Sequence, residues 1–171
     1  MDTVDKVTRS YIMSRVGQKD TGPEIILRCA LHRMGFRYRL HDRKLPGSPD
    51  LVFPRFGGVI FVHGCYWHSH GCYKSTVPQS SREFWTEKFK TNRQRDKRNI
   101  DLLLEHGWRV MIVWECALVG KIALPPGEVA ARAHAWLYGA RSQGEVSGTR
   151  VTGKPIESTR LSARRGTTDS V

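Results

Sequence analysis

The chain has 171 residues, 39% of them hydrophobic, and a formal net charge of +12 with a sequence pI of about 10.0. This length is enough for one domain with a hydrophobic core and too short for two comfortable ones. The sequence shows no secretory signal and no apolar run long enough to span a membrane, so we expect a cytoplasmic protein. The positive charge favours a polyanionic partner, and nucleic acid is the best candidate.

Hydrophobic periodicity predicts an α/β sandwich with a mixed sheet flanked by helices. The motif Thr21-Gly-Pro-Glu is typical of a helix start, and Gly35 ends this helix after Met34. Cys29 lies in an apolar-rich part of the same helix and is predicted to be a small buried hydrophobe. The other predicted elements follow in chain order: strands over 37–41, 51–53 and 58–63, a helix over 82–106, a strand over 109–114 and a helix over 127–138.

Both ends of the chain are basic. The N-terminal stretch 1–19 is either an arm that contacts the polyanion or a plain solvated segment. Its basic residues are Lys6, Arg9, Arg15 and Lys19. The segment 139–171 is rich in Gly, Ser, Thr and Arg and has no aromatic residue, so it is predicted to be a disordered basic tail. The folded domain is therefore expected to span 20–138.

The long predicted helix carries an apolar stripe with one acidic interruption. Helical spacing places Trp85, Phe89 and Leu103 on this stripe, and its continuation passes through Asp96. A buried carboxylate needs a partner, so Asp96 faces a histidine or arginine of a polar site. Alternatively, it lies at the edge of the stripe and pairs with Lys or Arg one turn away.

The segment 59–72 concentrates metal-binding residue types at the end of an apolar strand. Cys65 and Cys72 bracket His68 and His70, and a second apolar strand ends at Cys116. If these strands are adjacent, their ends bring the sulfurs together in a structural zinc site. Zinc is favoured over a disulfide because of the expected compartment and the interleaved histidines. Spacing leaves open which histidine is the fourth ligand.

Asp50 stands at the mouth of a predicted strand, after the turn-rich residues 45–49. A hairpin across 54–58 would place it near the histidine cluster. A carboxylate beside imidazoles in a basic protein suggests metal-assisted phosphodiester hydrolysis, in which Asp50 binds magnesium and a histidine outside the zinc site deprotonates water.

Seven motifs, in order along the chain, resemble those of the very-short-patch-repair (Vsr) DNA mismatch endonucleases. They are Asp5-Lys-Val-Thr-Arg-Ser-Tyr-Ile-Met-Ser-Arg-Val, Asp20-Thr-Gly-Pro-Glu, Leu45-Pro-Gly-Ser-Pro-Asp, Val62-His-Gly-Cys-Tyr-Trp-His-Ser-His-Gly-Cys, Phe84-Trp-Thr-Glu-Lys-Phe, Asn92-Arg-Gln-Arg-Asp and Gly107-Trp-Arg-Val-Met-Ile-Val-Trp-Glu-Cys. The resemblance runs from about Asp5 to Trp136 and leaves only the tail uncovered.

The resemblance implies a restriction-endonuclease-like (PD-(D/E)XK) fold and an enzyme that nicks one strand 5′ to the thymine of a T:G mismatch. Such mismatches arise when 5-methylcytosine deaminates. The implied partner is double-stranded DNA containing the mismatch, mismatch-repair factors are candidate partners, and the protein would be a nucleoid-associated monomer. Two alternatives stay open: a sequence-specific, restriction-type endonuclease of the same fold, and a zinc-stabilised DNA-binding module without catalysis.

The resemblance also assigns roles. Asp50 and the main-chain carbonyl of Val62 would hold Mg²⁺, His68 would be the general base, and His63, Asp96 and Glu24 would support them. The zinc ligands would be Cys65, His70, Cys72 and Cys116. The DNA-contacting residues would be the aromatic wedge Tyr66, Trp67 and Trp85 and the arm residues Lys6, Arg9, Arg15 and Lys19.

Two departures from the expected pattern bear on catalysis. The strand after Asp50 reads Phe61-Val62-His63, where the wider superfamily carries an acid and a lysine. The implied chemistry therefore differs from the superfamily's usual scheme. Val62 stands where a relative has threonine, but a main-chain ligand tolerates valine.

Overall fold

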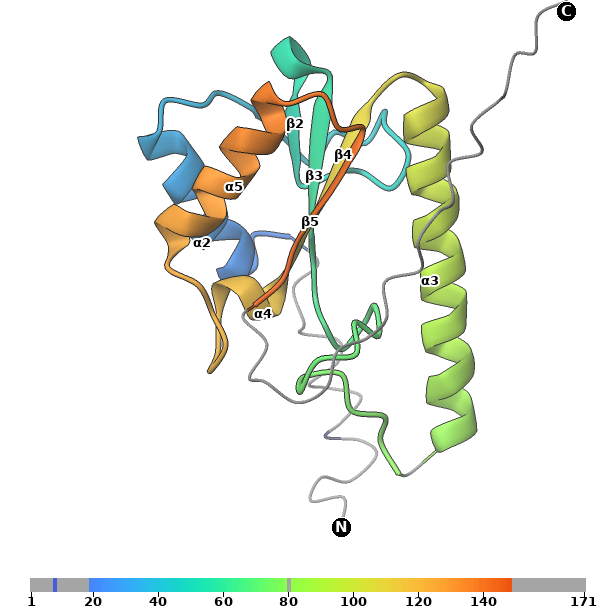
Figure 1. Ribbon diagram of the computed structural model, residues 1–171. Helices are drawn as coiled ribbons and strands as arrows, with labels where there is room; N and C mark the ends of the chain where they lie inside the picture. Colours follow the sequence, from blue (N-terminus) through green and yellow to red (C-terminus); the bar gives the residue numbers. More distant parts are fainter. Residues whose placement is uncertain (1–7, 9–18, 80, 149–171) are drawn as a thin grey trace, which may run out of the picture.

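The computed structural model describes residue 8, residues 19–79 and residues 81–148. This part of the chain forms a five-stranded mixed sheet flanked by helices (Figure 1). The strands lie in the order β1 (Arg39–Leu40), β2 (Leu51–Phe53), β3 (Gly58–His63), β4 (Arg109–Trp114) and β5 (Gln143–Val146). The first three strands pair antiparallel, whereas β3, β4 and β5 run parallel. The predicted α/β class and the predicted hairpin between β2 and β3 are confirmed.

The helices cover both faces of the sheet. Figure 1 shows α2 (Gly22–Arg33), the short α4 (Glu115–Leu118) and α5 (Pro126–Tyr138) on one side, and α3 (Arg82–Glu105) on the other. The 3₁₀ turn η1 (Pro54–Phe56) joins β2 to β3.

Strand periodicity divides the core between these two faces. Alternate residues of β3 therefore face opposite ways, so Ile60 packs in the cluster with α2 and α5, and Val59 and Phe61 pack in the cluster with Leu103 of α3.

The predicted helices form with nearly the predicted bounds. Pro23 occupies the first turn of α2, and Gly35 follows its end with a φ of 89°, a left-handed value that glycine adopts without strain. In α3, Trp85, Phe89 and Leu103 are buried on one stripe, as expected. None of the described helices is long and apolar enough to cross a lipid bilayer.

The prediction that the chain is disordered from Gly139 is wrong for its first part, because Gln143–Val146 form β5 at the edge of the sheet. This strand lacks an apolar run, and its pairing with β4 and the burial of Val146 hold it in place. Gly144 allows the ring of Trp136 to pack directly on the strand, since an added Cβ would lie 2.8 Å from that ring. The rest of the predicted tail, 149–171, lies outside the described residues.

Two smaller expectations also fail. The first strand covers only Arg39–Leu40 of the predicted 37–41. Cys29 is exposed and not buried, because the buried stripe of α2 consists of Glu24, Leu27, Ala30 and Leu31. The prediction was wrong because it relied on the apolar neighbours of Cys29 in the sequence and not on its position around the helix.

Candidate active site

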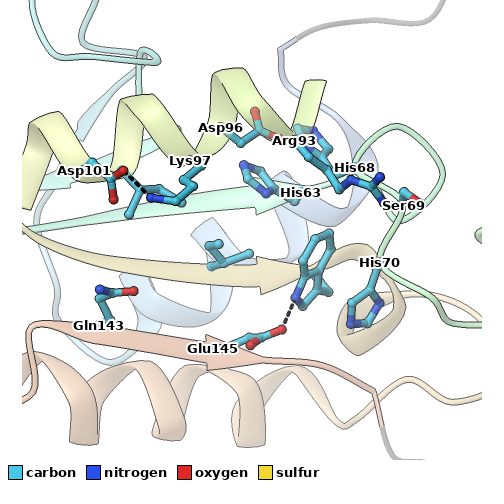
Figure 2. Close-up of a pocket in the computed structure, with 13 residues that line it drawn as sticks. His63, His68, Ser69, His70, Arg93, Asp96, Lys97, Asp101, Gln143 and Glu145 are labelled. Atoms are coloured by element: carbon cyan, nitrogen blue, oxygen red, sulfur yellow. Dashed lines mark hydrogen bonds and ion pairs between the residues drawn. The ribbon is translucent and has the colours of Figure 1, made fainter. Parts of the chain in front are cut away.

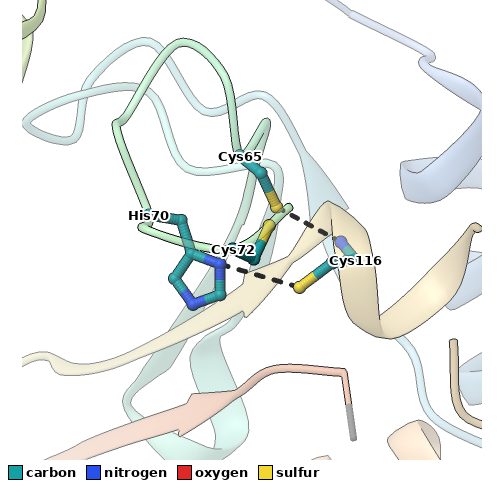
Figure 3. A group of neighbouring side chains, drawn as sticks. All are labelled: Cys65, His70, Cys72 and Cys116. Carbon is teal, nitrogen blue, oxygen red and sulfur yellow. Dashed lines mark hydrogen bonds between the residues drawn. The ribbon is translucent and has the colours of Figure 1, made fainter. Parts of the chain in front are cut away.

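The ends of two parallel strands bring four metal-binding side chains together. Cys65 follows β3 and Cys116 lies in the first turn of α4 after β4, while the loop after β3 supplies His70 and Cys72 (Figure 3). Their candidate ligand atoms all lie within 4.8 Å of one another. The four cysteines of the chain are free, so the disulfide between Cys65 and Cys72 does not form. The structure also places His70, and not His68, beside the sulfurs.

Backbone amides surround the three sulfurs of this cluster. Cys116 N–H donates to Cys65 Sγ at 3.3 Å, Lys74 N–H to Cys72 Sγ at 3.4 Å, and Gly148 N–H to Cys116 Sγ at 3.4 Å. Burial raises the pKa of the Cys65 and Cys116 thiols in the absence of a cation. Thiolates therefore need both the amide donors and a positive ion, and this donor set suits a metal.

A second cluster lies in an adjacent groove of about 580 Å³ (Figure 2). His63 ends β3, His68 lies in the loop after it, and Asp96 projects from the middle of α3. His68 Nδ1 is hydrogen-bonded to an Asp96 carboxylate oxygen. Of the two readings of Asp96, the structure therefore supports the one in which a histidine of a polar site is its partner. Arg95 is a second, more distant partner, with Nη2 3.6 Å from Asp96 Oδ1.

Electrostatics give the members of this cluster different charges. Burial, together with the neighbouring His68, lowers the pKa of His63 to about 3, so His63 is neutral near pH 7. Burial alone would raise the pKa of Asp96, but the hydrogen bond from His68 and the nearby charges of His68, His63 and Arg95 together outweigh burial and hold this pKa below its usual value. A charged Asp96 accepts a hydrogen bond from the protonated Nδ1 of His68, so the Nε2 of His68 is left as the basic nitrogen.

Asp50 lies at the start of β2, on the same end of the sheet. Its Oδ2 accepts the N–H of Val62 at 2.7 Å, so the β2–β3 hairpin fixes the carboxylate. Burial raises the pKa of Asp50 to about 6, and the nearby Glu24 acts in the same direction. The side chain of Asp50 is 18% exposed, and the positive charge near it is too small to offset the effect of burial on its pKa.

Glu24 completes the acidic part of the site from the first turn of α2. It is only 2% exposed, and its Oε1 lies 3.2 Å from Arg28 Nη1 and 3.0 Å from His41 Nε2. Sequence reasoning did not find His41, because it belongs to no motif and lies at the end of a two-residue strand.

The predicted aromatic wedge forms one packed cluster with Phe89. The ring of Tyr66 lies edge-on to Trp67, Trp85 and Phe89, with centroids 5.2, 5.6 and 5.1 Å away. Tyr66 and Trp67 are partly exposed, whereas Trp85 is 9% exposed and belongs to the core in this conformation. Phe84, which is 62% exposed beside Trp85, is a further aromatic that sequence reasoning did not single out.

The predicted basic arm falls largely outside the described residues. Lys6, Arg9 and Arg15 lie there, and Lys19 is exposed at the start of the described segment 19–79.

A histidine base and a buried carboxylate in a strongly basic domain suit an enzyme that cleaves phosphodiester bonds. The family model "DNA mismatch endonuclease Vsr" matches residues 1–74. The DNA mismatch endonuclease Vsr of Escherichia coli strain K12 is 43% identical over 145 residues, which cover 85% of this chain and 93% of that protein. The type II nicking enzyme V.XorIIP of Xanthomonas oryzae pv. oryzae is 46% identical over 117 residues, covering 68% and 86% of the two chains. The type II nicking enzyme V.NmeAIP of Neisseria meningitidis is 42% identical over 113 residues, covering 66% and 81%.

The chain therefore belongs to the Vsr family of DNA mismatch endonucleases. It is an endonuclease, a hydrolase that acts on DNA.

Proposed function

We propose that the protein nicks one strand of duplex DNA 5′ to the thymine of a T:G mismatch left by deamination of 5-methylcytosine. The names of the relatives, a mismatch endonuclease and nicking enzymes, support the substrate and the single-strand cut. The observation that carries the chemistry is the His68–Asp96 hydrogen bond on the same end of the sheet as the buried carboxylate of Asp50. A monomer suits this asymmetric lesion.

Asp50 and the main-chain carbonyl of Val62 would hold a magnesium ion. The fit rests on Asp50, because a buried carboxylate with a raised pKa and a carboxylate neighbour, Glu24, gains from a hard divalent cation. The hydrogen bond from Val62 places the two residues in contact. When bound, magnesium would screen the phosphate charge and stabilise the charge that develops on the leaving oxygen.

His68 is the general base of this proposal. Asp96 orients the ring and keeps the proton on Nδ1, so Nε2 takes the proton of the attacking water. His63 packs flat against His68 and stays neutral, which avoids a second positive charge beside the base. Glu24 supports the site as the carboxylate neighbour of Asp50.

Cys65, His70, Cys72 and Cys116 would hold a structural zinc ion. Three sulfurs and one imidazole, with no carboxylate, form a closed donor set of the kind that zinc prefers. The ion would fix the loop 64–72, which also carries His68, and would therefore position the base.

Tyr66 and Trp67 would enter the DNA stack beside the mismatch, with Trp85 supporting them from the core. A mismatched step is easier to unstack, and stacking on an aromatic ring recovers part of that free energy. The basic arm with Lys6, Arg9, Arg15 and Lys19 would contact backbone phosphates.

The test is a nicking assay on end-labelled duplexes that carry either T:G or C:G at candidate methylation sites, with magnesium present or replaced by calcium. The proposal expects magnesium-dependent nicking of the T:G duplex alone, lost in His68→Ala and Asp50→Asn. Cutting of both strands of the C:G duplex would instead support a restriction-type enzyme. Binding without cutting in every sequence context would support a DNA-binding module.

A further inference from the structure

His41 contacts two acidic residues of the proposed active site, Asp50 through its main chain and Glu24 through its ring. Its backbone N–H donates to the carbonyl oxygen of Asp50 at 3.3 Å, through the pairing of β1 with β2. Its side chain places Nε2 3.0 Å from Glu24 Oε1 and Nδ1 3.8 Å from Asp50 Oδ1. The second distance is too long for a direct hydrogen bond. His41 is therefore fixed to Asp50 by its main chain and contacts Glu24 with its ring.

The backbone of His41 has an uncommon conformation. Its φ is 48°, in the left-handed region, which residues with a Cβ seldom occupy. Its side chain is 13% exposed, and Nε2 is fully buried without a well-aligned hydrogen bond, so its contact with Glu24 is a close electrostatic one. A buried ring nitrogen needs a polar partner, and Glu24 is the acceptor within reach.

Glu24 depends on this contact because it is almost fully buried. Its second partner, the guanidinium of Arg28, also contacts the exposed Asp20 and so is shared with the surface. Of the two partners, His41 is the one whose main chain is also hydrogen-bonded to Asp50. Both contacts are made to Glu24 Oε1, and neither engages Oε2.

A metal ion held by His41 itself is a weaker explanation. Donor atoms of Asp20, Glu24 and His41 do lie within 4.8 Å of one another. However, the guanidinium of Arg28 contacts both carboxylates and already supplies the positive charge that a cation would bring. The cluster therefore fits a histidine that holds a carboxylate in place.

We propose that His41 is a positioning residue that fixes Glu24 relative to Asp50, so that the two carboxylates meet a divalent cation at a set separation. This inference rests on the proposed magnesium-dependent nicking. It assigns His41 no contact with DNA and no proton transfer.

The test measures metal binding directly. Binding of Mn²⁺ is titrated by electron paramagnetic resonance in complexes with a T:G duplex, with every variant made in a His68→Ala background so that the DNA stays intact. We expect His41→Ala and His41→Gly to weaken Mn²⁺ binding roughly 10- to 100-fold, the range found when a residue that orients a metal ligand is removed. His41→Gln, which restores an amide donor toward Glu24, should recover most of the affinity. His106→Ala, which removes an exposed histidine at the end of α3, should change nothing.

The glycine variant separates the side chain from the backbone, because glycine accepts the left-handed φ of this position. If His41→Ala does not fold, His41→Gly still tests the proposal. Unchanged Mn²⁺ affinity in His41→Gly would overturn the role of His41 while leaving the nicking proposal intact. If the parent complex bound no Mn²⁺ and the native chain did not nick, the proposed function would fail first and this inference with it.

Discussion

The imidazole rings of His63 and His68 lie face to face, with centroids 3.9 Å apart and planes 4° apart. Burial and the neighbouring His68 keep His63 neutral by lowering its pKa to about 3, and Asp96 holds the Nδ1 of His68. The proposed base is therefore fixed by one uncharged stacking partner and one carboxylate.

Removal of either partner of the His68–Asp96 pair should reduce catalysis more than DNA binding. We expect His68→Ala to lower kcat by about 10²- to 10⁴-fold, the usual contribution of a general base. Asp96→Asn should lower kcat by a smaller factor, since the ring loses its charged acceptor but keeps a polar neighbour. Single-turnover nicking with saturating enzyme measures the first effect, and a binding titration in calcium is the control. A loss confined to binding would contradict the assignment.

Replacement of Asp50 should separate stability from activity. Its folded pKa of about 6 is above the ordinary carboxyl value of 3.8, so the carboxylate destabilises the fold as pH rises from about 4 to 6, and the full penalty is present above pH 6. In magnesium-free buffer, Asp50→Asn should therefore be more stable than the native chain by up to about 3 kcal/mol at pH 8, with a smaller difference at pH 5. Urea unfolding at both pH values measures this. A variant that is less stable at pH 8, or that nicks normally, would oppose our account of Asp50.

The Cys/His cluster predicts one zinc ion per chain and a matched cysteine control. Cys65→Ser or Cys116→Ser should lose the metal and lower the melting temperature, because the ion would join loop 64–72 to α4. Cys29→Ser should keep both, since Cys29 is exposed on α2. Elemental analysis of the purified proteins measures the zinc content, and thermal unfolding measures the melting temperature. Full zinc content in Cys116→Ser would exclude this site.

Truncation should distinguish β5 from the segment that follows it. A chain ending at Gly148 keeps β5 and the amide that donates to Cys116 Sγ, so we expect it to retain zinc and fold normally. A chain ending at Tyr138 loses both, and it should bind zinc more weakly and unfold at lower temperature. Equal stability and metal content of the two truncated proteins would show that β5 does not support the site.

The two tryptophans of the aromatic cluster should respond differently. Trp85→Ala removes a buried side chain and should cost about 3–5 kcal/mol of unfolding free energy. Trp67→Ala should cost less stability, because Trp67 is partly exposed, yet it should reduce the preference for T:G over C:G duplexes. Denaturant unfolding and competitive nicking of the two duplexes measure these effects. Unchanged mismatch preference in Trp67→Ala would remove it from the wedge.

Sequence patterns predicted the parts of the site in which metal-binding residue types follow apolar strands. Cys65 and Cys116 each lie two residues beyond the end of an apolar strand, and parallel pairing of these strands brings the sulfurs together. Spacing left the choice between His68 and His70 open, whereas the family resemblance assigned His70 to the metal, and the path of loop 64–72 brings His70 beside the sulfurs. β5 was not predicted because its pairing with β4, rather than its own residues, makes it a strand. His41 was missed because its place beside Glu24 depends on a two-residue strand and a left-handed backbone.

The most direct test of the central claim is the position of the nick when the mismatch is reversed. Two duplexes of the same sequence are labelled on both strands, with thymine of the T:G pair on one strand in the first and on the other strand in the second. We predict a single cut 5′ to the thymine in each, so that the cut strand changes with the thymine. A cut that stays on one strand, or that falls on both strands, would contradict mismatch-directed nicking.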